Sequence, residues 1–171
     1  MLDNERENNM KKRFIGKLEV SPIGMGCMGF SHGYGKIPEK QYSIEAIRKA
    51  YAFGCTFFDT AEVYGNELYW EGHNEEILGE AVENFRKNIV IATKLHIHDE
   101  EVTPNMDLYH LIKSHLEKSL KRLRTNYVDL YYLHRVNEFV PVEDVAAVMG
   151  KLIDEGLIKG WGLSQVDVDT L

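Results

Sequence analysis

Four residues able to support acid–base chemistry follow three apolar segments of the chain. Asp59 and then Tyr64 follow the segment at 56–58, and Lys94 and His134 end the two later ones. Tyrosine is a poor acid at neutral pH because its ordinary pKa is about 10. A nearby ammonium favours the phenolate and lowers that pKa, and a carboxylate keeps the ammonium charged. With a histidine orienting a carbonyl oxygen, such a set could protonate that oxygen as a hydride reaches the carbon.

Each of these residues also has an ordinary structural explanation. Alone, Lys94 would be a solvated loop lysine and Tyr64 a loop-packing residue. Asp59 could cap a turn, and His134 could be a buried histidine with satisfied hydrogen bonds. The catalytic interpretation depends on whether the segments before them are neighbouring strands.

The chain alternates between short apolar runs and segments with helical spacing. Apolar runs begin near residues 57, 89, 127 and 158, which is compatible with βαβ units of about 30 or more residues. Helical periodicity covers 39–53, 74–85, 108–123 and 141–153. A further buried strand is expected at Ile23–Met28, and Asn74 is expected to cap the second helix. Such alternation predicts an α/β fold with a parallel sheet.

Two architectures fit this pattern, a doubly wound sheet and a (β/α)8 TIM barrel. Gly24, Gly26 and Gly29 match G-x-G-x-x-G, but one such match is a weak signal for a dinucleotide fold. In a barrel, reacting groups lie at the C-terminal ends of the strands, where all four candidates fall. We therefore expect a barrel. Because a whole barrel needs about 250 residues, only about five βα units are expected, over residues 13–171 after a disordered tail at 1–12.

Composition excludes several classes of protein. The 171 residues are 44% hydrophobic and 27% charged, which is typical of a globular domain rather than a disordered chain. A formal net charge of −7 argues against a nucleic-acid partner. No apolar stretch approaches the roughly 20 residues that span a bilayer, and the polar N-terminus does not resemble a secretory signal. Two cysteines without a disulfide pattern predict a cytoplasmic location.

Several segments together resemble the aldo-keto reductase family. FFDTAEVYG, IATK, YVDLYYLHR and IKGWGLSQ are similar to that family's signature segments and occur in the same order. SPIGMGCMGF resembles the first barrel strand, the segment before it the hairpin that closes the barrel floor, and HNEEILGEAV the second helix. The resemblance runs from about Lys12 to Leu171.

The resemblance implies NADP(H)-dependent reduction of aldehydes or ketones. Tyr64 would be the general acid, Lys94 would lower its pKa while paired with Asp59, and His134 would orient the carbonyl. The cofactor-binding positions would be Gly26, Cys27, Met28 and Asp59, together with Ser164 and Gln165, which match positions that hold the nicotinamide carboxamide. Gln165 stands where relatives commonly have Asn or Glu.

Two features depart from the family pattern. The loop after Tyr64, GNELYWEGHNEE, is longer than usual, and its Tyr69 and Trp70 could line the substrate pocket or form an ordinary apolar cluster. The family's adenosine and 2′-phosphate contacts come mainly from loops after strands seven and eight, which would follow residue 171. We therefore expect weak cofactor binding, little activity and self-association through exposed barrel edges, with Ile91 and Leu133 on an apolar inner face.

Two other interpretations were weighed. His96 and His98 with Asp99 could bind a metal, but a zinc site needs three or four ligands, so no metal is expected. The chain could also belong to a non-catalytic relative that binds nucleotide or a protein partner. The complete set of Asp59, Tyr64, Lys94 and His134 favours an enzyme acting on a small carbonyl substrate.

Overall fold

The computed structural model describes residues 11–33 and 35–168. The tail expected at 1–12 therefore lies outside the described residues except for its last two. The main elements alternate between strand and helix along the chain. They are β3 (Met25–Gly26), α1 (Lys40–Ala52), β4 (Phe57–Asp59), α2 (His73–Val82), β5 (Val90–Leu95), α3 (Leu108–Arg122), β6 (Leu130–Arg135), α4 (Val142–Asp154) and β7 (Trp161–Gln165). Short 3-10 helices are η1 (Met28–Phe30), η2 (Glu83–Asn88) and η3 (Asp99–Glu101).

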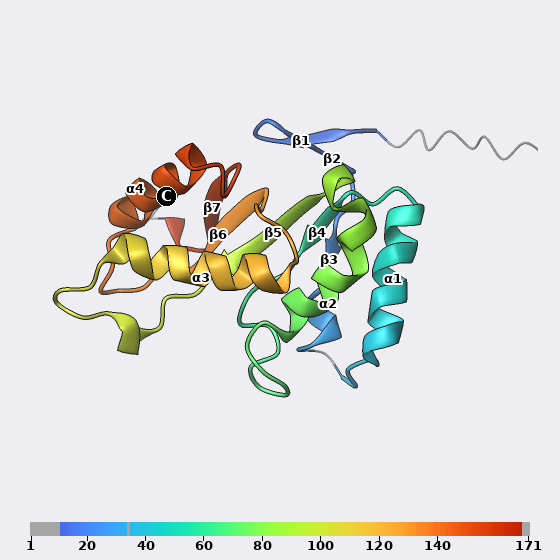
Figure 1. The fold of residues 1–171 in the computed structure, drawn as a ribbon, viewed down its shortest axis with the longest axis horizontal. Helices are drawn as coiled ribbons and strands as arrows, with labels where there is room; N and C mark the ends of the chain where they lie inside the picture. Colours follow the sequence, from blue (N-terminus) through green and yellow to red (C-terminus); the bar gives the residue numbers. More distant parts are fainter. Residues whose placement is uncertain (1–10, 34, 169–171) are drawn as a thin grey trace, which may run out of the picture.

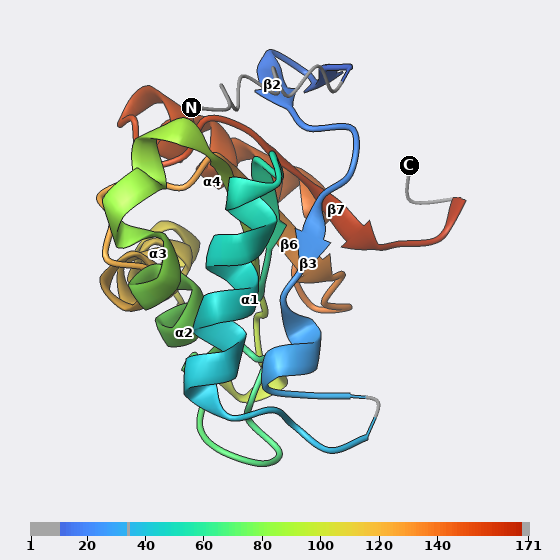
Figure 2. The same cartoon turned by 90° about the vertical axis from the view of Figure 1, so that its right-hand side faces the viewer.

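The five strands form one parallel sheet in the order β3-β4-β5-β6-β7. Each strand lies beside the next one in the sequence, and a helix connects each pair (Figure 1). The helices lie together on one side of the sheet (Figure 2). This is a partial (β/α)8 barrel, which confirms the predicted fold class and excludes the doubly wound sheet, whose strand order reverses.

The two faces of the sheet have different chemistry. In β5, Thr93 points toward the helices, because its hydroxyl bonds the carboxylate of Glu75 on α2. Alternate residues of a strand point to opposite faces, so Lys94 lies on the inner face, away from the helices. Ile91 and Leu133 belong to the apolar core packed against the helices. Their predicted place on the inner face was therefore wrong, because the strand phase points them outward.

An antiparallel hairpin precedes the sheet, formed by β1 (Arg13–Ile15) and β2 (Leu18–Val20). Ser21 and Thr56 exchange hydrogen bonds, each backbone N–H donating to the other side chain at 2.8 and 2.9 Å. The hairpin is thereby joined to the beginning of β4, at the N-terminal ends of the strands. It lies at the top of Figure 1, and the β4–α2 loop at the bottom.

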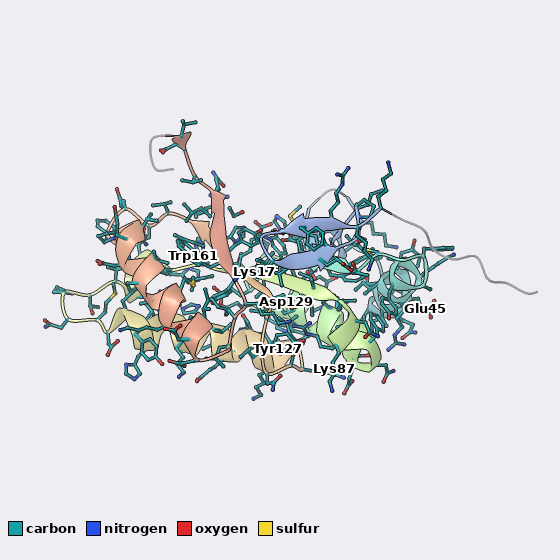
Figure 3. All side chains as sticks on the ribbon, turned by 90° about the horizontal axis from the view of Figure 1, so that it is seen from above. Lys17, Glu45, Lys87, Tyr127, Asp129 and Trp161 are labelled. Carbon is teal, nitrogen blue, oxygen red and sulfur yellow. The ribbon has the colours of Figure 1, made fainter. Side chains whose placement is uncertain are left out.

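Asp129 interrupts the apolar segment before β6 and is almost fully buried near that same end (labelled in Figure 3). Its carboxylate accepts hydrogen bonds from the Ile91 backbone N–H at 2.9 Å and from Lys159 at 2.7 Å, and it forms an ion pair with Arg86 at 2.9 Å. A buried carboxylate is tolerated when it is paired and hydrogen-bonded in this way. Asp129 therefore ties β5, η2 and the segment before β7 together.

Three local predictions differ from the structure. The strand expected at 23–28 is reduced to Met25–Gly26, and Ile23 is 74% exposed. Asn74 does not cap α2, since the helix begins at His73 after Gly72 in the left-handed region, and Asn74 is buried. The strand expected to begin near residue 127 begins at Leu130 and runs to Arg135, because Val128 makes only an isolated bridge to Ile158.

Two helical glycines give a matched test of the packing. A Cβ at Gly79 would lie 2.4 Å from the Arg122 carbonyl oxygen, whereas one at Gly150 would meet nothing within 4 Å. Gly79→Ala should lower the free energy of unfolding by about 1–3 kcal/mol through overpacking. Gly150→Ala should raise it by about 0.5–1 kcal/mol through helix propensity. Urea unfolding midpoints would measure both, and equal shifts would contradict the close approach of α2 to α3.

Candidate active site

The ammonium of Lys94 is the centre of the candidate site. Lys94 is 6% exposed, and its Nζ donates to Asp59 Oδ1 at 2.7 Å, to the Thr60 carbonyl oxygen at 2.8 Å and to Tyr64 Oη at 3.1 Å. These three acceptors use all three hydrogens of the ammonium. The structure thus brings Asp59, Lys94 and Tyr64 into direct contact, as the sequence predicts.

His134 lies beside this group at the end of β6. Its ring makes an edge-on contact with Tyr64, with centroids 5.7 Å apart. Burial lowers the pKa of His134 to about 4, and the positive charge of Lys94 adds to the effect. Its Nδ1 is buried and finds no hydrogen-bond partner among the described residues. His134 is therefore a neutral imidazole near neutral pH, placed within reach of a group bound at Tyr64.

A cavity of about 430 Å³ opens next to Tyr64 and His134. Most of its lining residues carry polar side chains, among them three further imidazoles and one guanidinium. The other lining residues are Met28, His32, Val63, Asn66, Glu67, His96, His98 and Arg135. A small ligand in this cavity would contact Tyr64 and His134.

A buried hydrogen-bond network supports the segment between Asp59 and Tyr64. The Thr60 hydroxyl donates to Asn74 Oδ1 at 2.7 Å, and Asn74 Nδ2 donates to the Cys27 carbonyl oxygen at 2.9 Å and to Ser31 Oγ at 2.8 Å. Asn74 therefore fixes the residue whose carbonyl accepts from Lys94. This role of Asn74 was not predicted from the sequence, where its position before a helical segment indicated a cap.

The residues predicted to contact a cofactor flank the same end of the sheet. Ser164 and Gln165 end β7, and their exposed side chains make no hydrogen bond to another described residue. Such unpaired donors and acceptors fit the carboxamide group of a nicotinamide, which both donates and accepts hydrogen bonds. At the opposite edge of the sheet, Cys27 is 1% exposed, its backbone N–H donates to the Asp59 carbonyl oxygen, and its own carbonyl oxygen accepts from Asn74. Gly26 is exposed, and Met28 reaches the cavity wall.

Tyr69 and Trp70 are not brought to the cavity. The Tyr69 ring stacks on His73, with centroids 4.0 Å apart, and Trp70 Nε1 donates to Glu76 Oε2 at 3.3 Å. Neither residue lines the cavity that contains Tyr64. The structure therefore shows the two rings packed against the beginning of α2.

His96 and His98 lie on the cavity wall, with ring centroids 4.7 Å apart. Within residues 11–33 and 35–168, no group of three or more His, Cys, Asp or Glu side chains is placed to hold a metal ion. These two histidines were considered only as metal ligands and were not expected beside Tyr64. Their position two and four residues after Lys94 was the available signal.

No helix in the described part of the chain is long and apolar enough to cross a membrane.

The fold and the site together define a class of protein, a (β/α) barrel with an Asp-Tyr-Lys-His group at the C-terminal ends of its strands. Residues 22–171 match the model of the Aldo/keto reductase family. The chain belongs to that family.

Individual relatives agree with this assignment. The chain is 40% identical over 158 residues to "Probable aldo-keto reductase 1" of Glycine max, covering 90% of this chain and 44% of the relative. The holo form of an aldo-keto reductase from Bacillus halodurans superimposes with a TM-score of 0.75 at 30% identity, covering 92% of this chain and 51% of that one. An aldo-keto reductase from Klebsiella pneumoniae in complex with NADPH gives 0.71 at 29% identity, covering 89% and 48%. The chain spans about half the length of these relatives.

The low pKa of His134 can be measured by NMR of the imidazole. We expect His134 to stay neutral down to about pH 4, since burial and the Lys94 charge both oppose protonation. In Lys94→Met its pKa should rise toward the ordinary value of about 6.5 without reaching it, because burial remains. Lys159→Met, which removes an ammonium paired with Asp129, is the matched control and should leave the titration unchanged.

The same shift has a consequence for stability. The unfolded chain takes up a proton at His134 below about pH 6.5, whereas the folded chain does so only near pH 4. The contribution of His134 therefore lowers the free energy of unfolding as pH falls through this window. A His134 pKa near 6.5 in the folded wild type would contradict the buried placement.

Proposed function

We propose that the protein containing this chain reduces aldehydes or ketones to alcohols with NADPH, with Tyr64 as the general acid. The observation that carries the proposal is the Lys94 ammonium, which contacts both Asp59 and Tyr64 beside a cavity. The membership in the aldo-keto reductase family and the NADPH complex of the relative from Klebsiella pneumoniae support it.

Each of the four residues has a definite task in this reaction. Tyr64 gives its proton to the carbonyl oxygen, and Lys94 stabilises the phenolate that remains because its Nζ donates to Oη at 3.1 Å. Asp59 holds the ammonium in position. His134, which is neutral, can donate its one N–H to the same carbonyl oxygen and orient it toward Tyr64.

The cofactor would lie along the C-terminal edge of the sheet. The exposed side chains of Ser164 and Gln165 would hold a carboxamide, and the backbone at 26–28 would line the other side. Bound NADPH would supply the hydride that reduces the carbonyl carbon. The polar cavity wall, with His96, His98 and Arg135, favours a small polar carbonyl compound as substrate.

Substitution of the proposed acid tests this mechanism in the complete gene product. Tyr64→Phe should lower kcat by about 10²–10⁴-fold while NADPH affinity stays largely unchanged, because the phenol supplies the proton. Lys94→Met should also lower kcat, since it removes the charge that stabilises the phenolate. Tyr69→Phe, an exposed tyrosine of the same loop, is the control and should retain full activity. Carbonyl-dependent NADPH oxidation measures all three.

Two outcomes would contradict the proposal. Retained turnover in Tyr64→Phe would remove the general-acid role. Absence of carbonyl-dependent oxidation in the wild type, with NADPH still bound, would favour a non-catalytic nucleotide-binding relative.

We further propose that this chain self-associates through its sheet edges. Within the described residues β3 pairs only with β4, and β7 only with β6, so both outer strands have free edges. Free strand edges form hydrogen bonds with other chains.

The cytoplasm is the proposed location, which two free cysteines support.

Two measurements on the 171-residue chain test this second proposal. Sedimentation at micromolar concentration should show oligomers, and fluorescence titration should show weak NADPH binding, since the residues proposed to hold the cofactor are few. The Tyr64→Phe chain, titrated separately as a matched sample, should bind NADPH with the same affinity as the wild-type chain. A monomer that binds NADPH at low micromolar concentration would contradict both expectations.

A further inference from the structure

His115 on α3 is a buried histidine held between two carboxylates. It is 2% exposed, its Nδ1 lies 2.9 Å from Glu62 Oε2, and its Nε2 lies 3.0 Å from Glu101 Oε1. Glu62 comes from the β4–α2 loop and is 1% exposed, and Glu101 comes from η3. A carboxylate only accepts hydrogen bonds, so both ring nitrogens must donate, which requires the imidazolium form.

The other oxygen of each carboxylate accepts a hydrogen bond from the segment that follows β5. Glu62 Oε1 accepts from the backbone N–H of His96 at 2.6 Å, and Glu101 Oε2 accepts from that of His98 at 2.9 Å. The side chains of His96 and His98 line the cavity beside Tyr64. One buried imidazolium is thus linked, through two carboxylates, to both histidines of the cavity wall.

The surrounding charges favour a protonated His115. Burial lowers its pKa, but the hydrogen bonds and negative charges of Glu62 and Glu101 outweigh burial, and the pKa is raised overall. The other titratable groups near this cluster are the imidazoles of His96 and His98, the carboxyl group of Glu75 on α2 and the phenol of Tyr131 on β6. Without the imidazolium, Glu62 would be a buried carboxylate with no cation of the described residues at hydrogen-bond distance.

We propose that His115 is a positioning residue: it holds Glu62 and Glu101 so that they fix the backbone of His96 and His98 and shape the cavity wall beside Tyr64. Its importance for turnover rests on the proposed function, but the linkage itself does not. Because Lys94 keeps its own contacts with Asp59 and Tyr64, loss of His115 should disturb substrate binding more than proton transfer.

The wild-type chain provides the first test, by NMR with labelled histidine. Both ring nitrogens of His115 should carry protons at neutral pH, and the ring should titrate above the ordinary histidine range of about 6.5. Amide hydrogen exchange ordinarily becomes faster as pH rises. At His96 and His98 the exchange rate should rise more steeply than this as pH passes through the His115 titration. A neutral His115 at pH 6, or amides that do not respond to its titration, would overturn the proposal.

The second test compares two substitutions on the same helix. His115→Gln should make exchange at the His96 and His98 amides roughly tenfold to hundredfold faster, since hydrogen bonds to charged groups are lost. His110→Gln is the matched control, because His110 is exposed and pairs only locally with Asp107. Unchanged exchange in a folded His115→Gln would overturn the proposal, and if this variant does not fold, the wild-type titration decides.

Kinetics of the complete gene product separates positioning from a purely structural role. His115→Gln should raise KM for the carbonyl substrate with a smaller change in kcat, and the pH dependence of KM should lose the step at the His115 titration. His110→Gln should change neither. If the wild type shows no carbonyl reduction, the proposed function fails while the exchange experiments still test the positioning role. If His115→Gln instead lowers kcat and kcat/KM equally and leaves KM unchanged, the positioning role is overturned.

Discussion

A buried lysine ammonium is the constraint on which the site depends. An unpaired buried charge is so costly that the group would give up its proton, so Lys94 requires acceptors at every hydrogen. The three that it has come from one short stretch, Asp59, Thr60 and Tyr64. The stretch must therefore leave β4 in a conformation that returns the tyrosine to the lysine. Directly after Tyr64 the chain turns toward α2 at Gly65, which has φ of +118° and where a Cβ would lie 2.9 Å from the Trp70 carbonyl oxygen.

The alternation of side chains along parallel strands separates stability from chemistry. On β5, Ile91, Thr93 and Leu95 point toward the helices, so the apolar core and the Thr93–Glu75 hydrogen bond lie on that face. Lys94 has the opposite phase. A one-residue change in strand phase would exchange the two faces, placing the ammonium in the core. The register of Lys94 with Tyr132, and of Leu95 with Leu133, therefore determines both properties at once.

The sequence was sufficient for the strand order and for the group around Lys94, because both follow from local signals. Strands alternating with helices predict a parallel sheet, and residues ending neighbouring strands meet at one edge. Strand phase was harder. Ile91 and Lys94 occupy a continuous buried run whose apolar pattern has no alternation to indicate the direction of each side chain. Ile91 was therefore expected on the wrong face.

Partners distant in the sequence could not be predicted. Asn74 looked like a helix cap, because its role depends on Thr60 and Cys27, which no local pattern connects to it. Glu62 and His115 are 53 residues apart, and nothing near either one indicates an ion pair. For Cys27, the resemblance to the family implied ligand contact, but the residue is buried. Only the tertiary structure decides such pairings.

The segment from Asp59 to Tyr64 shows how a loop can hold a catalytic group as firmly as a strand. Its polar side chains have partners on both sides of the sheet. Asp59 and Tyr64 bond Lys94 on the inner face, while Glu62 bonds His115 on α3 and the His96 backbone. A regular strand also points alternate side chains to opposite faces, but it would continue straight on and would not bring Tyr64 back to Lys94. The loop achieves this because each polar side chain has a buried partner, so the Tyr64 hydroxyl has little freedom to move away from Lys94.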